Sequence, residues 1–208
     1  MTTPSSTPPS TPRRINHHWR VVDIVVASVV GVAAGLIFFA WNQIYSPVSA
    51  PLEAVLPGAQ ALVYGVWLIA GVLGGLIIRK PGAALFTETV AAVVSALLGA
   101  KWGGFLTLES GVVQGLGAEL IFLIFLYANW RVWVAMLAGA GAGVAMAISD
   151  LILWYPGAKP AFVLIYTVSS IISGALIAGL GSWYIVRGLA KTGVLGRFAS
   201  GRETTARI

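Results

Sequence analysis

The sequence contains no cysteine and only two histidines, His17 and His18, both close to the amino terminus. Without cysteine the chain has no disulfide, no thiol nucleophile and no thiolate metal ligand. Without a histidine in its apolar segments it has no imidazole metal centre and no histidine base there. These absences exclude most of the chemistry used by membrane enzymes, so we expect neither an enzyme nor a cofactor.

Charged residues are also scarce, at 10% of the 208 residues, whereas 58% are hydrophobic and the mean hydropathy is +0.88. Soluble domains carry about 25% charged residues. A membrane-spanning helix needs roughly 20 mostly apolar residues, so the chain has room for about five to seven spans and no separate soluble domain. The composition therefore predicts an all-α membrane protein.

Six apolar segments predict a six-transmembrane-helix bundle. Residues 1–19 are expected to be a disordered tail, because proline, serine and threonine dominate its beginning. Residues 20–187 would form the transmembrane domain, and residues 188–208 a basic tail. We expect a proline-broken loop at residues 46–60, which could act as a lid over the outer mouth. The six segments are 21–45, 61–78, 83–98, 111–128, 132–154 and 161–186.

The positive charges predict the orientation of the bundle, because cytoplasmic loops of membrane proteins are enriched in lysine and arginine. With the amino terminus in the cytoplasm, eleven of the 13 lysines and arginines fall in cytoplasmic segments. Only Lys101 and Lys159 then lie in outer loops. We therefore expect both termini on the cytoplasmic side of the cell membrane.

Small residues recur at four-residue spacing in several segments, as with Ala27, Gly31 and Gly35 in the first. This spacing puts small side chains on one helix face and lets two helix backbones approach closely. Most such faces are expected to pack within this chain. Their number also allows for a partner helix from another protein.

Ionisable and amide side chains inside the apolar segments are the main candidates for a binding site. Each charge costs at least ~2.5 kcal/mol to insert into a membrane. Asp23 lies near the inner interface beside Arg20, and we expect it to be solvated or locally paired. The other candidates come from three segments, and Glu119 is predicted near the middle of the membrane. They are Glu88, Gln114, Glu119 and Asp150.

Aromatic residues gather at the outer level of the same segments. Tyr64 and Trp67 are three residues apart and share a helix face with Gln60, while Trp102 and Trp154 lie at outer segment ends. Tryptophan and tyrosine line membrane interfaces in general, but the shared face with Gln60 favours a polar interior for the first two. A pocket of aromatic rings and carboxylates suits a flat, cationic or hydrogen-bonding heteroaromatic ligand.

Several stretches of the sequence resemble a known family. They are YGVW at 64–67, IRKPGAAL at 78–85 with Glu88 following, LG and WG within 98–103, and QGLGAE at 114–119. Together they resemble the YkoE-type substrate-binding (S) components of energy-coupling-factor (ECF) vitamin importers. The similarity runs from about the second segment through the fifth and includes Asp150. It is weaker in the first and last segments.

The resemblance implies a six-helix protein of a prokaryotic cell membrane that captures thiamine or its hydroxymethylpyrimidine precursor from outside. It also implies two kinds of partner, a transmembrane coupling (T) component and two cytoplasmic ATPases, with Ala27, Gly31 and Gly35 at the partner-helix interface. The ligand-contacting residues that it implies are Tyr64, Trp67, Glu88, Trp102, Gln114, Glu119 and Asp150.

Glu119 and Asp150 keep an alternative role. Gln114 and Glu119 are five residues apart, which is about 140° around a helix, so we do not expect both of their side chains to face one ligand. Glu119 could bind a neighbouring helix instead, and Asp150 could be structural. For the whole chain, the alternative is a stand-alone secondary transporter of a small heteroaromatic solute, although no convincing internal repeat of the kind typical of such transporters is present.

Overall fold

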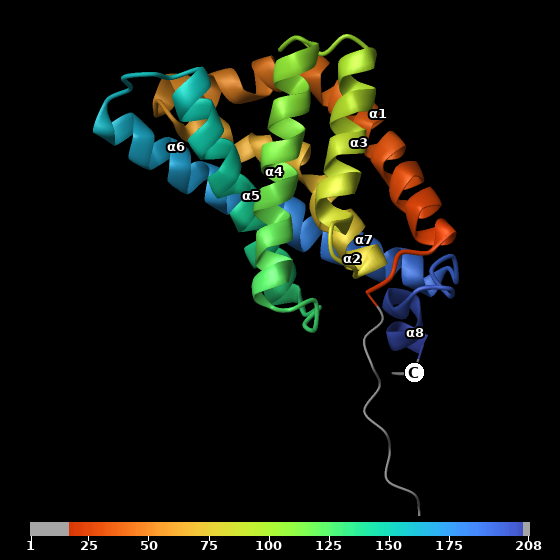
Figure 1. The fold of residues 1–208 in the computed structure, drawn as a ribbon. Helices are drawn as coiled ribbons and strands as arrows, with labels where there is room; N and C mark the ends of the chain where they lie inside the picture. Colours follow the sequence, from red (N-terminus) through yellow and green to blue (C-terminus); the bar gives the residue numbers. More distant parts are fainter. Residues whose placement is uncertain (1–16, 206–208) are drawn as a thin grey trace, which may run out of the picture.

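The computed structural model describes residues 17–205, and all its regular elements are helices (Figure 1). Residues 1–16 and 206–208, which include most of the predicted tail and Arg13, Arg14 and Arg207, lie outside the described residues. Two elements are not α-helical, since η1 is a 3₁₀ helix and η2 is a π-helix. The elements are α1 (Val21–Val55), η1 (Ala59–Leu68), α2 (Ile69–Ile78), α3 (Ala83–Leu97), α4 (Gly104–Ile124), α5 (Val132–Leu153), α6 (Pro160–Ser173), η2 (Gly174–Leu180), α7 (Gly181–Lys191) and α8 (Ala199–Thr205).

Among the described residues, five helical stretches are long and apolar enough to cross a membrane. A sixth apolar helix, α3, has 15 residues, a length of about 22 Å, which is less than the ~30 Å of a bilayer core. The prediction of an all-helical membrane protein is therefore confirmed. The five stretches are Val21–Val55, Ala59–Ile78, Gly104–Ile124, Val132–Leu153 and Pro160–Lys191.

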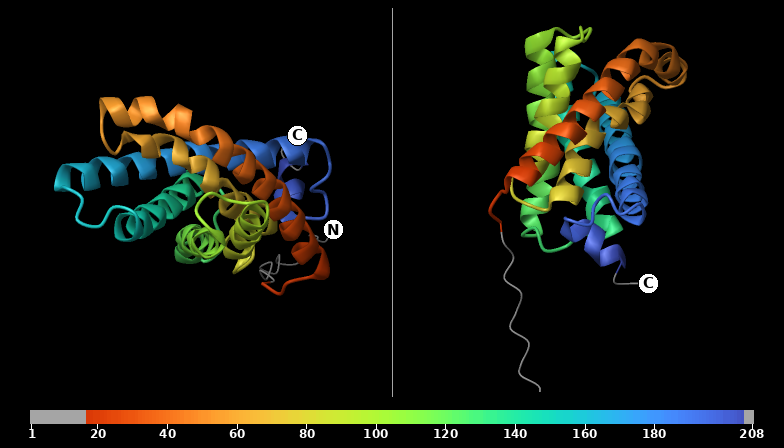
Figure 2. Two further views of the ribbon diagram at one scale, coloured as in Figure 1. Left: turned by 90° about the horizontal axis from the view of Figure 1, so that it is seen from above. Right: turned by 90° about the vertical axis from the view of Figure 1, so that its right-hand side faces the viewer.

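The bundle has two ends, which we name after one residue in each (Figures 1 and 2). The Lys80 end holds the start of α1, the turn at residues 79–82, the loop at 125–131 and α8. The Trp102 end holds the loops at 98–103 and 154–159. The helices α3 and α4 form an antiparallel pair between the two ends, and α1 crosses α3 obliquely (Figure 1). The described chain therefore begins and ends on one side of the bundle.

Helix α1 differs from the prediction, because it continues through Pro47 and Pro51 to Val55 instead of ending at Tyr45. Proline is tolerated inside membrane helices where nearby groups satisfy the freed backbone atoms. In the same stretch the Ser49 hydroxyl donates to the Ser46 carbonyl at 3.3 Å. The predicted loop at residues 46–60 is consequently helical over most of its length, which corrects the expectation of a proline-broken loop there.

The small-residue face of α1 packs inside the chain, against α3. Ala27, Gly31 and Gly35 are buried. A Cβ atom added to Gly31 would lie 2.7 Å from Cβ of Val90, and one added to Gly35 would lie 2.6 Å from Cβ of Val94. The structure therefore corrects the expectation that this face contacts a partner helix, because α3 already occupies the close approach that the small residues permit.

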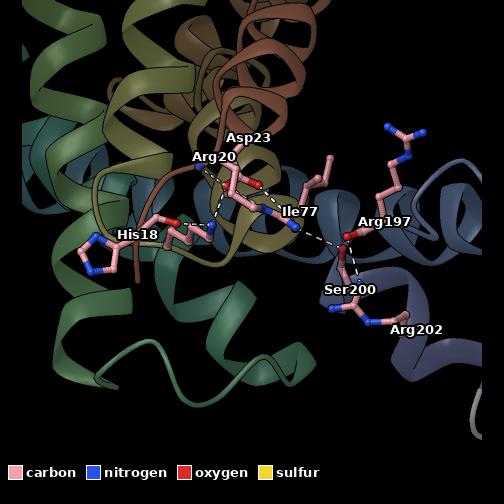
Figure 3. Close-up of polar contacts among 8 residues, drawn as sticks. His18, Arg20, Asp23, Ile77, Arg197, Ser200 and Arg202 are labelled. Atoms are coloured by element: carbon pink, nitrogen blue, oxygen red, sulfur yellow. Dashed lines mark hydrogen bonds and ion pairs between the residues drawn. The ribbon is translucent and has the colours of Figure 1, made fainter. Parts of the chain in front are cut away.

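A buried ion-pair network joins three segments at the Lys80 end (Figure 3). The Asp23 carboxylate accepts hydrogen bonds from Arg20 Nη2 at 2.8 Å and from Lys80 Nζ at 2.5 Å. Lys80 Nζ also donates to the His18 carbonyl at 2.5 Å. Asp23 is fully buried, so its role is local pairing and not solvation. The network holds the start of α1 against the turn between α2 and α3.

The carboxyl-terminal segment packs on the same end. Helix α7 continues to Lys191, and Leu195 and Phe198, which lie between α7 and α8, are buried. The Ser200 hydroxyl donates to the Ile77 carbonyl at 3.1 Å (Figure 3). The part of the predicted basic tail that the structure describes, up to Thr205, thus includes ordered helix.

Candidate functional site

A cavity of ≈ 310 Å³ lies between α1, η1, α3, α4, α5 and α6. Trp102 and Trp154 lie at the Trp102 end of this cavity, and Glu88 lies deeper in the bundle. The volume is at the lower end of the range for small-molecule pockets. The cavity is lined by six of the seven predicted ligand-contacting residues, namely Tyr64, Trp67, Glu88, Trp102, Gln114 and Asp150.

Tyr64 and Trp67 form one side of the cavity because of the unusual pitch of η1. Side chains three residues apart eclipse each other in a 3₁₀ helix. The two ring centroids are accordingly 5.2 Å apart, with an interplanar angle of 65°. The Trp67 indole Nε1–H donates to Oδ1 of Asn42 at 3.0 Å, and the Asn42 amide donates to Ser95 Oγ at 3.2 Å. These bonds fix the indole plane against α1 and α3.

The aromatic side of the cavity continues through Tyr45, whose ring connects η1 to the loop at the Trp102 end. Its centroid lies 5.0 Å from Trp67 and 5.7 Å from Trp102. The Trp102 ring in turn lies 5.5 Å from that of Trp154. We call Tyr64, Trp67, Trp102 and Trp154 the aromatic wall. It offers ring faces and edges from η1 to the mouth of the cavity.

Glu88 is the buried carboxylate of the cavity, with 1% of its surface exposed. Its Oε2 accepts a hydrogen bond from the Gly71 backbone N–H at 2.5 Å. Gly71 lies in the first turn of α2, directly after the 3₁₀ helix η1. A Cβ added to Gly115 would lie 3.0 Å from Cβ of Glu88, so glycine leaves room for the side chain. The other oxygen, Oε1, is buried with no hydrogen-bond partner.

Asp150 supplies a second carboxylate, which is held by a tyrosine. The hydroxyl of Tyr166, itself 1% exposed, donates to Oδ2 of Asp150 at 2.6 Å. Tyr166 also packs on Tyr64, with centroids 6.3 Å apart. The same side chain therefore orients a carboxylate and supports the aromatic wall.

Glu119 does not join the other predicted site residues. Its carboxylate accepts backbone N–H bonds from Gly82 at 2.6 Å, Ala84 at 2.9 Å and Leu85 at 3.3 Å, and an O–H bond from Tyr127 at 2.6 Å. It thereby caps the start of α3. Burial and the bond to Glu119 raise the pKa of Tyr127, which keeps the phenol protonated as a donor.

The displacement of Glu119 from mid-depth follows from the limits of α4. This helix begins at Gly104, ahead of the predicted start at Gly111, and ends at Ile124. Glu119 consequently lies near the Lys80 end. Gln114, more than one turn earlier, is 8% exposed and lines the cavity. The angular separation of the two residues on the helix thus corresponds to two separate roles.

Two of the cavity residues that the sequence analysis missed hold other members of the site in place. Asn42 and Tyr166 both line the cavity and are both almost completely buried. An amide inside the first apolar segment was a usable signal for Asn42, because an uncharged polar group also needs a partner in a membrane. Tyr166 had a weaker signal in the sequence: it lies four and seven residues before Ser170 and Ser173, so the three polar side chains share one helix face.

The arrangement suits a flat organic ring with hydrogen-bond donors. The aromatic wall provides stacking and cation–π contacts, while the unpaired Oε1 of Glu88 is an acceptor at the buried end. Within residues 17–205, no three histidine, aspartate or glutamate side chains come together in a way that could hold a metal ion.

All three comparisons with known proteins are to transporter components, and the cargoes that two of their descriptions name differ. A family model described as "ABC-type cobalt transport system, permease component" matches residues 22–145. The chain is 40% identical over 186 residues to YkoE of Bacillus subtilis (strain 168), which is provisionally named an HMP/thiamine permease protein, and the match covers 89% of this chain and 92% of that protein. It is also similar to the crystal structure of an S-component of an ECF transporter, with a TM-score of 0.83, 38% identity and coverage of 91% of this chain and 95% of that one.

Proposed function

The chain belongs to the YkoE-type family of permease S components of ECF transporters, and from this membership we propose that it captures thiamine or hydroxymethylpyrimidine (HMP). The observation that carries the proposal is the cavity itself. An aromatic wall and a buried carboxylate oxygen without a partner face the same space. A pyrimidine ring with an exocyclic amino group offers both a π-face and donors to such a site.

In this proposal Glu88 accepts a hydrogen bond from the ligand through Oε1. Its other oxygen is already held by Gly71, so the carboxylate is fixed before the ligand arrives. Tyr64 and Trp67 stack against the ring, and Gln114 adds a neutral polar contact. Asp150 lies on a different helix from Glu88 and suits a donor or positive charge at the other end of the ligand.

The proposed topology has six spans with both termini in the cytoplasm. It is supported by two contacts at the Lys80 end, where most of the cations lie: Arg20 lies over the ring of Phe198, which directly precedes α8, and Ser200 of α8 bonds the Ile77 carbonyl. The loops at the Trp102 end carry only Lys101 and Lys159, as expected for an outer surface. The cavity would then open outward, where an importer first meets its ligand. The short helix α3 would make the sixth span with the help of its flanking turns.

ATP hydrolysis, in this proposal, belongs to partner ATPases that act through a transmembrane coupling component. The small residues of α1 are not available to that partner, because they face α3. A contact through α1 would therefore use its opposite face, which carries the exposed Val29 and Leu36. Residues 20–187 would form the transmembrane unit, preceded and followed by cytoplasmic segments.

Uptake measurements test this function. We expect cells that lack their own thiamine uptake to accumulate labelled thiamine or HMP when they express the chain together with a coupling component and its ATPases. Accumulation should disappear when the ATPases carry inactivating substitutions, and an excess of Co²⁺ should not compete. Uptake by the chain alone that an ionophore abolishes would instead establish a secondary transporter, and competition by Co²⁺ would point to a metal ion as cargo.

A further inference from the structure

The 3₁₀ helix η1 carries Tyr64 and Trp67 of the aromatic wall, and its pitch determines how these two side chains are oriented relative to each other. Ten consecutive residues are in this conformation, whereas 3₁₀ runs longer than about four residues are uncommon. In an α-helix, residues three apart are offset by about 60°. The placement of Tyr64 relative to Trp67 therefore depends on how the turn of η1 between them is held.

Ser173 provides a direct contact with the backbone of η1 at this point. Its hydroxyl donates to the Leu62 carbonyl at 2.7 Å and accepts from the Gly65 N–H at 2.7 Å. These two backbone groups are the pair that an i to i+3 hydrogen bond would join. The hydroxyl thus bridges the turn of η1 that contains Tyr64. Ser173 itself is 2% exposed and lies outside the cavity lining.

The surroundings fix the position of this hydroxyl. Ser173 is the last residue of α6, immediately before the π-helix η2. A Cβ added to Gly65 would lie 2.8 Å from Ser173 Oγ, so only glycine permits the approach. On the far side of η2, a Cβ added to Gly139 would lie 2.8 Å from the Gly174 carbonyl carbon. The serine is therefore held between η1 and α5 by close backbone contact.

We propose that Ser173 is a positioning residue for ligand binding: its hydroxyl stands between the Leu62 carbonyl and the Gly65 N–H, so it sets the shape of the η1 turn that carries Tyr64 and with it the spacing of Tyr64 and Trp67. Removal of the hydroxyl lets the Leu62 carbonyl and the Gly65 N–H approach each other directly, which changes the shape of this turn and rotates Tyr64 relative to Trp67. Affinity then falls although no group that touches the ligand has been changed. The binding part of this inference rests on the proposed function.

The test compares Ser173→Ala with Ser170→Ala in the full-length protein. Ser170 is a matched control because it is a fully buried serine of the same helix, and its hydroxyl donates to the Tyr166 carbonyl one turn earlier. The ligand-free protein is labelled with 5-fluorotryptophan, and the ¹⁹F resonance of Trp67 is assigned with Trp67→Phe. We expect this resonance to shift or broaden in Ser173→Ala and to stay in place in Ser170→Ala.

Affinity for thiamine and HMP is then measured on the same samples. Ser173→Ala should weaken binding roughly tenfold, as for the loss of one buried hydrogen-bonding partner, and Ser170→Ala less than about twofold. If Ser173→Ala does not fold, Ser173→Cys, whose thiol is a weaker donor and acceptor, should move the Trp67 resonance to a smaller extent.

An unmoved Trp67 resonance in the Ser173 variant, or an equal effect of the two serines, would overturn the proposal. If the wild-type protein binds neither ligand, the proposed function fails. The ¹⁹F spectrum of the ligand-free protein still reports on the positioning role of Ser173 in that case.

Discussion

Replacing Glu119 with glutamine separates a structural carboxylate from a ligand-binding one. The side chain accepts three backbone N–H bonds at the start of α3 and one O–H bond from Tyr127. Hydrogen bonds to a charged group contribute about 1.5–3 kcal/mol each, and a charge at a helix start adds about 0.3–2 kcal/mol. Glutamine keeps one acceptor oxygen and turns a donor toward backbone N–H groups.

We therefore expect Glu119→Gln to lower the free energy of unfolding by about 3 kcal/mol or more. For a chain of this size that corresponds to a fall in melting temperature of roughly 6–12 °C. The eight tryptophans allow the transition to be followed by intrinsic fluorescence in detergent. Thiamine affinity, measured below the transition, should change less than about twofold because the side chain does not line the cavity.

Glu109→Gln is the matched control, since it makes the same chemical change on the same helix. Glu109 accepts one side-chain bond, from Ser149 at 3.0 Å, so its melting temperature should move by no more than about 2 °C. A Glu119→Gln protein with wild-type stability but at least tenfold weaker thiamine binding would refute the structural assignment of Glu119.

Three further predictions follow from named contacts. Asp23→Asn should cost about 3–5 kcal/mol, because it leaves the buried Lys80 without its charge partner; thermal unfolding should show Asp23→Leu combined with Lys80→Met to be more stable than either single variant. Gly31→Ala should lower the melting temperature of the isolated chain, since its Cβ would lie 2.7 Å from that of Val90. An unchanged melting temperature would contradict the packing of this face on α3 and favour a contact with a partner helix. Glu88→Gln should weaken thiamine binding at least tenfold in a titration while the melting temperature stays within a few degrees, because one oxygen still accepts from the backbone.

The sequence predicts where the helices lie better than where they end. Hydropathy identifies each apolar segment, because apolar runs of about 20 residues are typical of membrane-spanning helices. It does not identify the end of α1, since Pro47 and Pro51 are compatible with a membrane helix when nearby groups satisfy the backbone. It also misses the start of α4 at Gly104, where glycine gives no helical signal.

The site shows the same limit at the level of single side chains. Tyr64 and Trp67 were predictable from their spacing alone, because residues three apart share a face in either kind of helix. Glu88 and Glu119 look alike in the sequence, and only their partners from distant segments distinguish them. Both accept bonds from backbone N–H groups at the start of a helix, but only Glu88 keeps an unpaired oxygen and lines the cavity.

The measurement that tests the central claim most directly is a calorimetric titration of the purified chain, without partners, with thiamine and with HMP. The account predicts saturable binding of at least one of them at one site per chain, at least tenfold weakened in Glu88→Ala and nearly unchanged in Glu109→Gln. Absence of saturable binding of both compounds to the folded wild-type chain, or equal binding by the Glu88 variant, would contradict it.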